Sequence, residues 1–165
     1  MHNSANLCTS LFVYFCAAKF IRMNNQALAA RVVDAMFSND LFSRWLGIER
    51  VVVEPGRCVL KMTVRKEMLN GFDIAHGGIC YSLADSALAF ASNSHGRKAV
   101  SVETSISLTE QVKENDVLTA AAEEISLSNK IGVYEIKVTN QENKIAALFK
   151  GTVYRTSKDW FPEDK

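Results

Sequence analysis

The sequence predicts an α+β domain in which one antiparallel sheet curves around a single long helix. Residues 70–92 read as a loop that leads into a helix of mostly Ile, Leu, Ala and Phe, apolar nearly all round. Two β-branched runs precede this stretch and four β runs follow it, without a second β-helix-β unit. A helix that lacks a polar face has to be enclosed, and a single sheet encloses a helix only by wrapping around it.

Length and composition are those of one compact domain, with 165 residues of which 48% are hydrophobic and 22% charged. We expect the folded unit to span residues 23–157, followed by a tail over residues 158–165. Residues 1–22 are expected to be a disordered extension or the product of a misassigned start. Their apolar run at residues 11–18 is too short to cross a bilayer, and no basic leader or clean cleavage site marks a signal peptide.

Charge and cysteine content exclude several classes of function. A formal net charge of +1 gives no electrostatic reason to expect nucleic acid or an anionic membrane as a partner. The four cysteines form no Cys-x-x-Cys pair, and three histidines are too few for a zinc pattern. We therefore expect reduced thiols, a cytoplasmic protein, and neither a metal ion nor an organic cofactor.

The elements before the central helix follow from local patterns. Apolar residues at helical spacing predict a helix over residues 26–37, capped by Asn24 or Asn25. A short turn of helix is expected over residues 41–46 and should end at Gly47. The runs at residues 48–54 and 57–64 are separated by Glu-Pro-Gly, a tight-turn signal, so they predict a hairpin.

Four strands are expected after the central helix, over residues 99–108, 117–127, 132–139 and 144–154. The first of them alternates in character along its whole length. Because side chains alternate across a strand, this pattern predicts one dry face and one polar face. The dry face would carry Val100, Val102, Thr104, Ile106 and Leu108, and the polar face Ser101, Glu103, Ser105 and Ser107.

The start of the central helix has the composition of an anion site. His76, Gly77 and Gly78 directly precede the apolar run, so the glycines shape the first helical turn. Backbone N–H groups in a first turn lack intrahelical acceptors, and the helix dipole is positive there. Such a turn favours a bound or developing negative oxygen, and a glycine lets a ligand approach the backbone closely.

Two polar side chains near this turn need an explanation. Asp85 lies seven residues after Gly78, about two turns along, on the face that also carries Ser82. An isolated carboxylate is costly to bury, so Asp85 should be exposed, paired with a cation, or directed into a cleft where its pKa is shifted for use. Asn70 precedes Gly71, and on spacing alone this pair is first a turn signal.

Taken together, Asn70, His76-Gly77-Gly78 and Asp85 resemble the signature of the hotdog-fold acyl-CoA thioesterases of the phenylacetate-degradation (PaaI) type. The resemblance extends over about residues 35–155. It implies a hotdog fold and hydrolysis of phenylacetyl-CoA or a related aryl or medium-chain acyl-CoA. It also implies homodimers or homotetramers with a continuous sheet, in which each active site lies between subunits.

The resemblance also implies roles for individual residues. Asp85 would be the nucleophile or the general base. The Gly77 N–H would polarise the thioester carbonyl, and the adjacent Gly78 would help to bind the substrate. Asn70 would position the carbonyl or the water. His76 would be a positioning group rather than a general acid, and a purely structural role, in which its ring bonds to local backbone, is the stronger alternative.

Substrate-binding residues are less specifically marked. Ser101 loosely matches a residue that binds or orients water in related enzymes, and the alternative is a solvent-facing strand serine. Arg97, Lys98 and Lys130 lie in predicted loops, where they would bind the coenzyme A phosphates or simply be solvated. The acyl pocket, or else only the core, would be lined by Phe72, Ile74, Tyr81 and Leu88.

The chemistry has to proceed through a carboxylate, because no Gly-x-Ser-x-Gly motif or Ser-His-Asp set is apparent. Cys80 is an alternative nucleophile, although a small buried hydrophobic residue is the better interpretation. Two other functions remain open for the same fold. One is a non-catalytic domain that binds acyl-CoA, and the other is hydration of an enoyl-CoA.

Overall fold

The computed structural model describes residues 25–162, and its largest element is a six-stranded antiparallel sheet. The strands lie in the order β1-β2-β4-β5-β6-β3, so β1 and β3 form the two edges. Three helices accompany the sheet: one over residues 25–39, α2 (Leu41–Leu46) and α3 (Gly77–Asn93), with a short 3-10 turn at Lys66–Met68. The strands are β1 (Glu49–Glu54), β2 (Arg57–Thr63), β3 (Arg97–Leu108), β4 (Val117–Leu127), β5 (Ile131–Thr139) and β6 (Ile145–Asp159).

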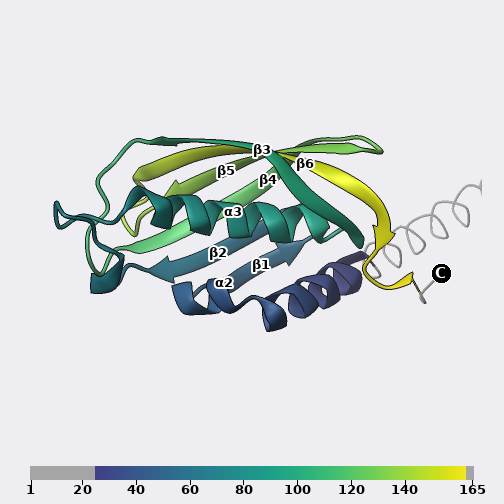
Figure 1. Ribbon diagram of the computed structural model, residues 1–165, viewed down its shortest axis with the longest axis horizontal. Coiled ribbons are helices and arrows are strands. Elements are labelled where there is room, and N and C mark those ends of the chain that lie inside the picture. The colour runs from purple at the N-terminus through teal and green to yellow at the C-terminus, as the bar shows by residue number, and fades with distance from the viewer. Residues whose placement is uncertain (1–24, 163–165) are drawn as a thin grey trace, which may run out of the picture.

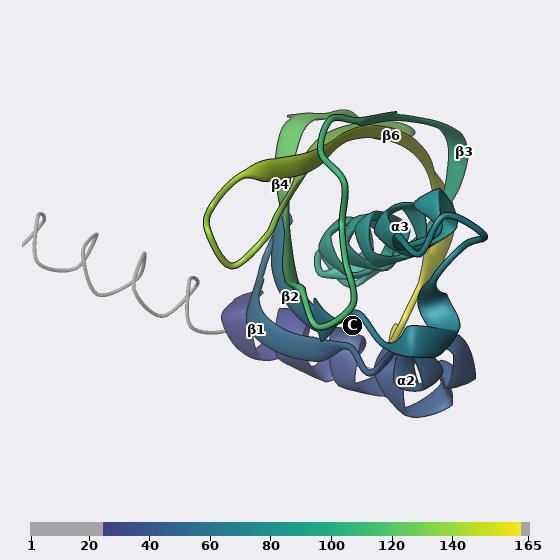
Figure 2. The same ribbon diagram turned by 90° about the vertical axis from the view of Figure 1, so that its left-hand side faces the viewer.

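The sheet curves around α3, which confirms the predicted hotdog fold (Figure 1). Seen along the helix, β2 and β4 lie on one side of α3, β6 passes above it, and β3 lies on the other side (Figure 2). The first helix and α2 cover the side of α3 that the sheet leaves open. The rings of Phe37 and Phe90 pack edge to face, with their centres 6.2 Å apart. The hydroxyl of Ser43 lies 3.0 Å from that of Ser86.

The local predictions around α3 are confirmed within a few residues. The short helix α2 ends at Gly47, whose φ of +75° is the left-handed conformation expected of a helix-ending glycine. Gly56 has φ of +74° in the turn between β1 and β2. Asn24, one of the two predicted caps of the first helix, lies outside the described residues, as does all of the extension over residues 1–22.

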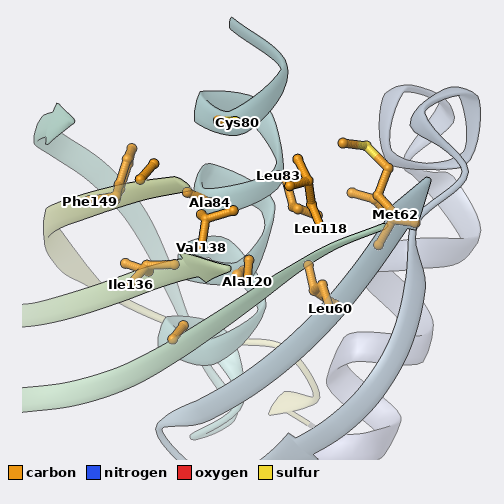
Figure 3. Packing of buried hydrophobic residues seen from close by; sticks show 14 of the residues in the cluster. Leu60, Met62, Cys80, Leu83, Ala84, Leu118, Ala120, Ile136, Val138 and Phe149 are labelled. Atoms are coloured by element: carbon orange, nitrogen blue, oxygen red, sulfur yellow. The ribbon is translucent and has the colours of Figure 1, made fainter. Parts of the chain in front are cut away.

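The core lies between the concave face of the sheet and α3 (Figure 3). Alanines on α3, at positions 84, 87 and 91, let the strands approach the helix closely. Burying each Leu or Ile side chain here stabilises the fold by about 1.5–3 kcal/mol. The buried side chains labelled in Figure 3 include Leu60, Met62, Leu83, Leu118, Ile136, Val138 and Phe149.

The predicted dry face of β3 is wrong in its first half, because a β-bulge interrupts the alternation. Val100 pairs with Tyr154 and Ser101 with Val153, but the next pair is Glu103 with Thr152, so Val102 is an extra residue. Paired residues share a face of the sheet. Ser101 therefore lies on the inner face with the buried Val153, and Val100 lies on the outer face, where it is 56% exposed.

Beyond the bulge the predicted faces hold. Thr104 pairs with Gly151 and Ile106 with the buried Phe149, so both lie on the inner face. Because β3 is an edge strand twelve residues long, one side of its backbone has no strand beside it among the described residues. A long unprotected edge that carries exposed valines is unusual for an isolated domain.

The C-terminal part of the chain continues past the predicted end of the domain. Strand β6 runs to Asp159, and the backbone N–H of Trp160 donates to the carbonyl of Gly96 at 2.9 Å. The guanidinium of Arg31 in the first helix lies 3.7 Å from the ring centre of Phe161. Residues 158–162 of the predicted tail thus pack on the domain. Over the described range, no helix has both the length and the hydropathy needed to cross a bilayer.

Candidate active site

The start of α3 presents one backbone amide that the helix leaves unused. His76 is the N-cap, and its Nδ1 accepts a hydrogen bond from the Gly78 N–H at 3.0 Å. Its carbonyl accepts from the Ile79 N–H at 2.8 Å. Gly77 is the first helical residue, so its N–H has no intrahelical acceptor and lies at the positive end of the helix dipole. This geometry fits a structural role for His76, as a cap that fixes the helix start.

The two glycines permit this arrangement sterically. A Cβ added at Gly77 would lie 2.8 Å from Cδ1 of Leu108, closer than real Cβ contacts come. A Cβ at Gly78 would lie 3.0 Å from Nδ1 of His76, the atom that makes the cap. The absence of side chains therefore keeps Leu108 and the His76 ring close to the helix start.

Asn70 forms the turn that precedes this helix, as its spacing predicted. Its Oδ1 accepts from the Phe72 N–H at 2.8 Å, and its backbone N–H donates to the Ile74 carbonyl at 2.8 Å. The turn uses the side-chain oxygen, so the Nδ2 group remains to donate to a ligand. Asn70 and Gly77 share a pocket of about 310 Å³, here called the amide pocket, which is also lined by Ile74, Cys80, Leu108 and Gln111.

Asp85 lies in a second pocket, of about 370 Å³, here called the acid pocket. The carboxylate is half-buried, and among the described residues it has no hydrogen bond or ion pair. Burial raises the pKa of Asp85, because the charged form is poorly solvated there. A partly buried carboxylate without a cation is a candidate for function. The pocket is also lined by Leu88, Ala89, Asn93, Ser101 and Trp160.

The bulge in β3 brings Ser101 into the acid pocket beside Asp85. Sequence reasoning placed Ser101 on the opposite face from Val100, which is correct, but it took the valine side as the inner one. It also missed Trp160 as a lining residue, because the chain after residue 157 was expected to be a tail. The signal that was available is the large aromatic pair Trp160-Phe161, which is unusual in a solvated tail.

One copy of the chain does not bring Gly77 and Asp85 to the same place. They are eight residues apart in α3, which is about 12 Å along the axis at 1.5 Å per residue. A reacting carbonyl needs its oxygen about 3 Å from a donor and its carbon about 3 Å from the attacking atom. In a single chain the amide pocket and the acid pocket are therefore separate, and neither holds both groups.

Of the basic residues predicted to bind the coenzyme A phosphates, Lys98 lines the acid pocket, whereas Arg97 and Lys130 lie outside both pockets. Arg97 braces β3 against β6, donating to the carbonyls of Thr156 and Arg155 and, at 2.8 Å, to Oδ1 of Asn129. Lys130 Nζ lies 3.5 Å from the hydroxyl of Tyr154.

Phe72 is 85% exposed, whereas Ile74 and Leu88, proposed with it, line the amide and acid pockets respectively. The Tyr81 hydroxyl shares a hydrogen bond with the hydroxyl of Thr104 at 2.6 Å.

Other chemistries find less support in the geometry. Burial raises the pKa of Cys80 to about 11, so its thiol is protonated at neutral pH and is a poor nucleophile. Within residues 25–162, no three His, Cys, Asp or Glu side chains lie close enough together to hold a metal ion.

The fold, the helix-start amide and the unpaired acid are features of a hotdog domain equipped for acyl transfer, and sequence comparison shows the family. A profile of the thioesterase superfamily matches residues 72–147. Acyl-coenzyme A thioesterase PaaI of Escherichia coli is 40% identical over 121 residues, which is 73% of this chain and 86% of that protein. The chain therefore belongs to the thioesterase superfamily.

Other relatives agree with this assignment. A putative esterase of Archaeoglobus fulgidus is 39% identical over 153 residues, covering 93% of this chain and 97% of that protein. The structure of E. coli PaaI superposes with a TM-score of 0.80 at 37% identity, covering 81% of this chain and 97% of the other. A Streptococcus mutans protein bound to acetyl CoA superposes with a TM-score of 0.66 at 28% identity, covering 68% and 90% respectively.

Proposed function

We propose that this protein hydrolyses acyl-CoA thioesters, and that the acyl group is phenylacetyl or a related aryl or medium-chain group. The observation that carries the proposal is the half-buried Asp85, which has no partner within the described residues and sits in a largely apolar pocket of a thioesterase-superfamily domain. The relatives support the substrate class, since one is an acyl-coenzyme A thioesterase and another was crystallised with acetyl CoA.

The complete site forms between two copies of the chain. Both pockets border β3, since Leu108 lines the amide pocket near one end and Ser101 lines the acid pocket near the other. Antiparallel pairing of β3 with its symmetry mate reverses the strand direction. The amide pocket of one protomer then meets the acid pocket of its partner, and the exposed edge with Val100 and Val102 becomes covered.

Each group then has a role in acyl transfer. The thioester oxygen accepts a hydrogen bond from the Gly77 N–H, where the helix dipole stabilises the negative charge that develops on it. Asp85 of the other protomer attacks the carbonyl carbon, or removes a proton from the water that does so. The carbon–sulfur bond breaks, and coenzyme A leaves as the thiolate and is protonated. When water attacks, the acid is released directly. When Asp85 attacks, a mixed anhydride forms, and water hydrolyses it to release the acid and restore the carboxylate. Asn70 Nδ2 donates to the carbonyl or the water.

Secondary features of the proposal concern assembly and setting. The dimer presents its convex sheet or its helices for a further dimerisation, so a homotetramer is a natural extension. Two buried free cysteines, Cys58 and Cys80, support a reducing, cytoplasmic setting.

The test is release of free thiol from a panel of acyl-CoAs that includes phenylacetyl-CoA, with wild type and Asp85→Ala. Loss of a positioned acid–base group should lower kcat by about a hundredfold or more. If no member of the panel is hydrolysed while acyl-CoA binds saturably in calorimetry, the protein is a binding domain and the proposal fails. Single turnover in labelled water distinguishes the two routes, because isotopic oxygen appears in Asp85 only when the carboxylate attacks directly.

A further inference from the structure

Trp160 lines the acid pocket at its Asn93 end, where three neighbours hold it in place. Its indole Nε1–H donates to Oδ1 of Asn93 at 2.8 Å, and its backbone N–H donates to the Gly96 carbonyl at 2.9 Å. The Lys98 ammonium lies 5.0 Å from the ring centre. These contacts come from the end of α3, the turn after it and the start of β3, so the indole is a fixed wall.

The pocket runs from Asp85 to this wall along one face of α3. Asp85, Ala89 and Asn93 are four residues apart and therefore follow one another on the same side of the helix. From Asp85 to Asn93 the distance along the axis is about 12 Å. Ala89, between them, contributes only a methyl group, and Leu88 and Val153 supply further apolar lining.

The Asn93 amide beside the wall is already satisfied within the chain. The Nδ2 group of Asn93 donates to the carbonyls of Ala89 and Ala99, each at 3.0 Å. Its Oδ1 accepts from the Ala99 N–H at 3.0 Å and from the Trp160 indole. An amide has two donors and two lone pairs, so nothing on Asn93 remains for a ligand. Asn93 is fully bonded, and the Lys98 ammonium, which also lines the pocket, is held over the indole. The remaining lining by Leu88, Ala89 and Val153 therefore suits an apolar acyl group.

We infer that the acid pocket receives the acyl group of the substrate, and that Trp160 sets the greatest length of acyl group that fits. This inference rests on the proposed thioesterase function. A cavity of about 150 Å³ accepts benzene, and the acid pocket is more than twice that size at about 370 Å³. A fully extended chain advances about 1.2 Å per bond, so 12 Å holds roughly ten bonds. Aryl-acyl groups and chains of about eight to ten carbons fit, and longer chains meet the indole.

The experiment compares kcat/KM for straight-chain acyl-CoAs from four to sixteen carbons. Trp160→Ala removes the wall, so the ratio of the fourteen-carbon to the eight-carbon substrate should rise by about tenfold or more. Ala89→Leu fills the middle of the pocket, so the eight-carbon substrate should lose at least about tenfold relative to the four-carbon one. Trp45→Ala is the matched control, because this second tryptophan lies on α2, stacks on Phe42 and is 52% exposed. Its chain-length profile should equal that of wild type.

A profile unchanged by both Trp160→Ala and Ala89→Leu, in proteins with wild-type circular dichroism, would overturn the inference. Ala89→Leu leaves the contacts of Trp160 in place, so it tests the pocket even where Trp160→Ala does not fold.

A binding measurement separates this outcome from failure of the proposed function. In Trp45→Phe, Trp160 is the sole tryptophan, and its emission should shift with an eight-carbon, non-hydrolysable acyl-CoA thioether but not with coenzyme A alone. An emission shift without any thioester hydrolysis would support the acyl-binding pocket and refute the proposed thioesterase activity. No shift, alongside active hydrolysis, would reject the pocket.

Discussion

Asp85→Asn is expected to abolish most of the activity and at the same time to stabilise the fold. The carboxylate is half-buried, lacks a partner among residues 25–162, and has a pKa raised by burial. An acid whose pKa is higher in the folded state binds more protons there than in the unfolded chain. Its contribution to the free energy of unfolding therefore falls as pH rises from the unfolded pKa through the folded one. At neutral pH the charged Asp85 carboxylate destabilises the wild-type fold, whereas the neutral amide of Asp85→Asn does not.

The size of the effect follows from the kind of group involved. Relief of one poorly solvated polar group is worth on the order of 1 kcal/mol. For a domain of this length that corresponds to a rise in Tm of about 2–4 °C. Activity should fall by about a hundredfold or more, since a positioned acid–base group is lost. The same raised pKa means that kcat/KM of wild type falls with acidification at a pH above the usual range for an aspartate.

The assay pairs thiol release with thermal unfolding by circular dichroism at pH 7 and pH 4. The stability gain of Asp85→Asn should shrink at the lower pH, because wild type then becomes protonated. Glu135→Gln, which changes an exposed carboxylate on β5, is the control and should alter neither quantity. If Asp85→Asn retained activity within tenfold of wild type, Asp85 would not be the catalytic acid–base group. If its Tm at pH 7 were below that of wild type, the Asp85 carboxylate would not be an unpaired charge that destabilises the fold.

Three other substitutions test the remaining parts of the site. Gly77→Ala places a methyl group 2.8 Å from Cδ1 of Leu108, so kcat/KM should drop about tenfold or more while circular dichroism shows an intact helix, and unchanged kinetics would contradict the close approach. His76→Ala removes the cap, so Tm should fall by about 2–4 °C for a loss near 1 kcal/mol, with kcat reduced less than tenfold; a hundredfold loss would make His76 a catalyst. Val102→Lys places a charge on the edge of β3, so sedimentation velocity should show monomers, and activity should fall with the dimer fraction; active monomers would exclude a shared site.

The elements of this fold are predictable from sequence because their signals are local. Gly47 ends α2 by its left-handed conformation, and Pro55-Gly56 closes the first hairpin. The long apolar helix has to be covered by the sheet, whatever the order of the strands. These features need only neighbours within a few residues.

The features that escaped prediction depend on distant partners. The bulge at Val102 arises from how β3 registers with β6, and alternation along β3 alone gives no sign of it. Trp160 becomes a wall only because its indole finds Asn93, 67 residues earlier. The roles of Asn70, Gly77 and Asp85 were inferred from the resemblance to the thioesterase signature, whereas their placement in two particular pockets required coordinates.

In the proposed dimer, the separation of Gly77 from Asp85 along α3 makes the two protomers depend on each other for activity. A chain with a substitution at Asp85 still supplies an intact Gly77 N–H, and a chain with a substitution at Gly77 still supplies an intact Asp85 carboxylate. Random exchange between the two mutants yields half mixed dimers, each with one intact centre of two, so about a quarter of wild-type turnover should return on mixing. Two variants with impaired activity would then regain activity when mixed.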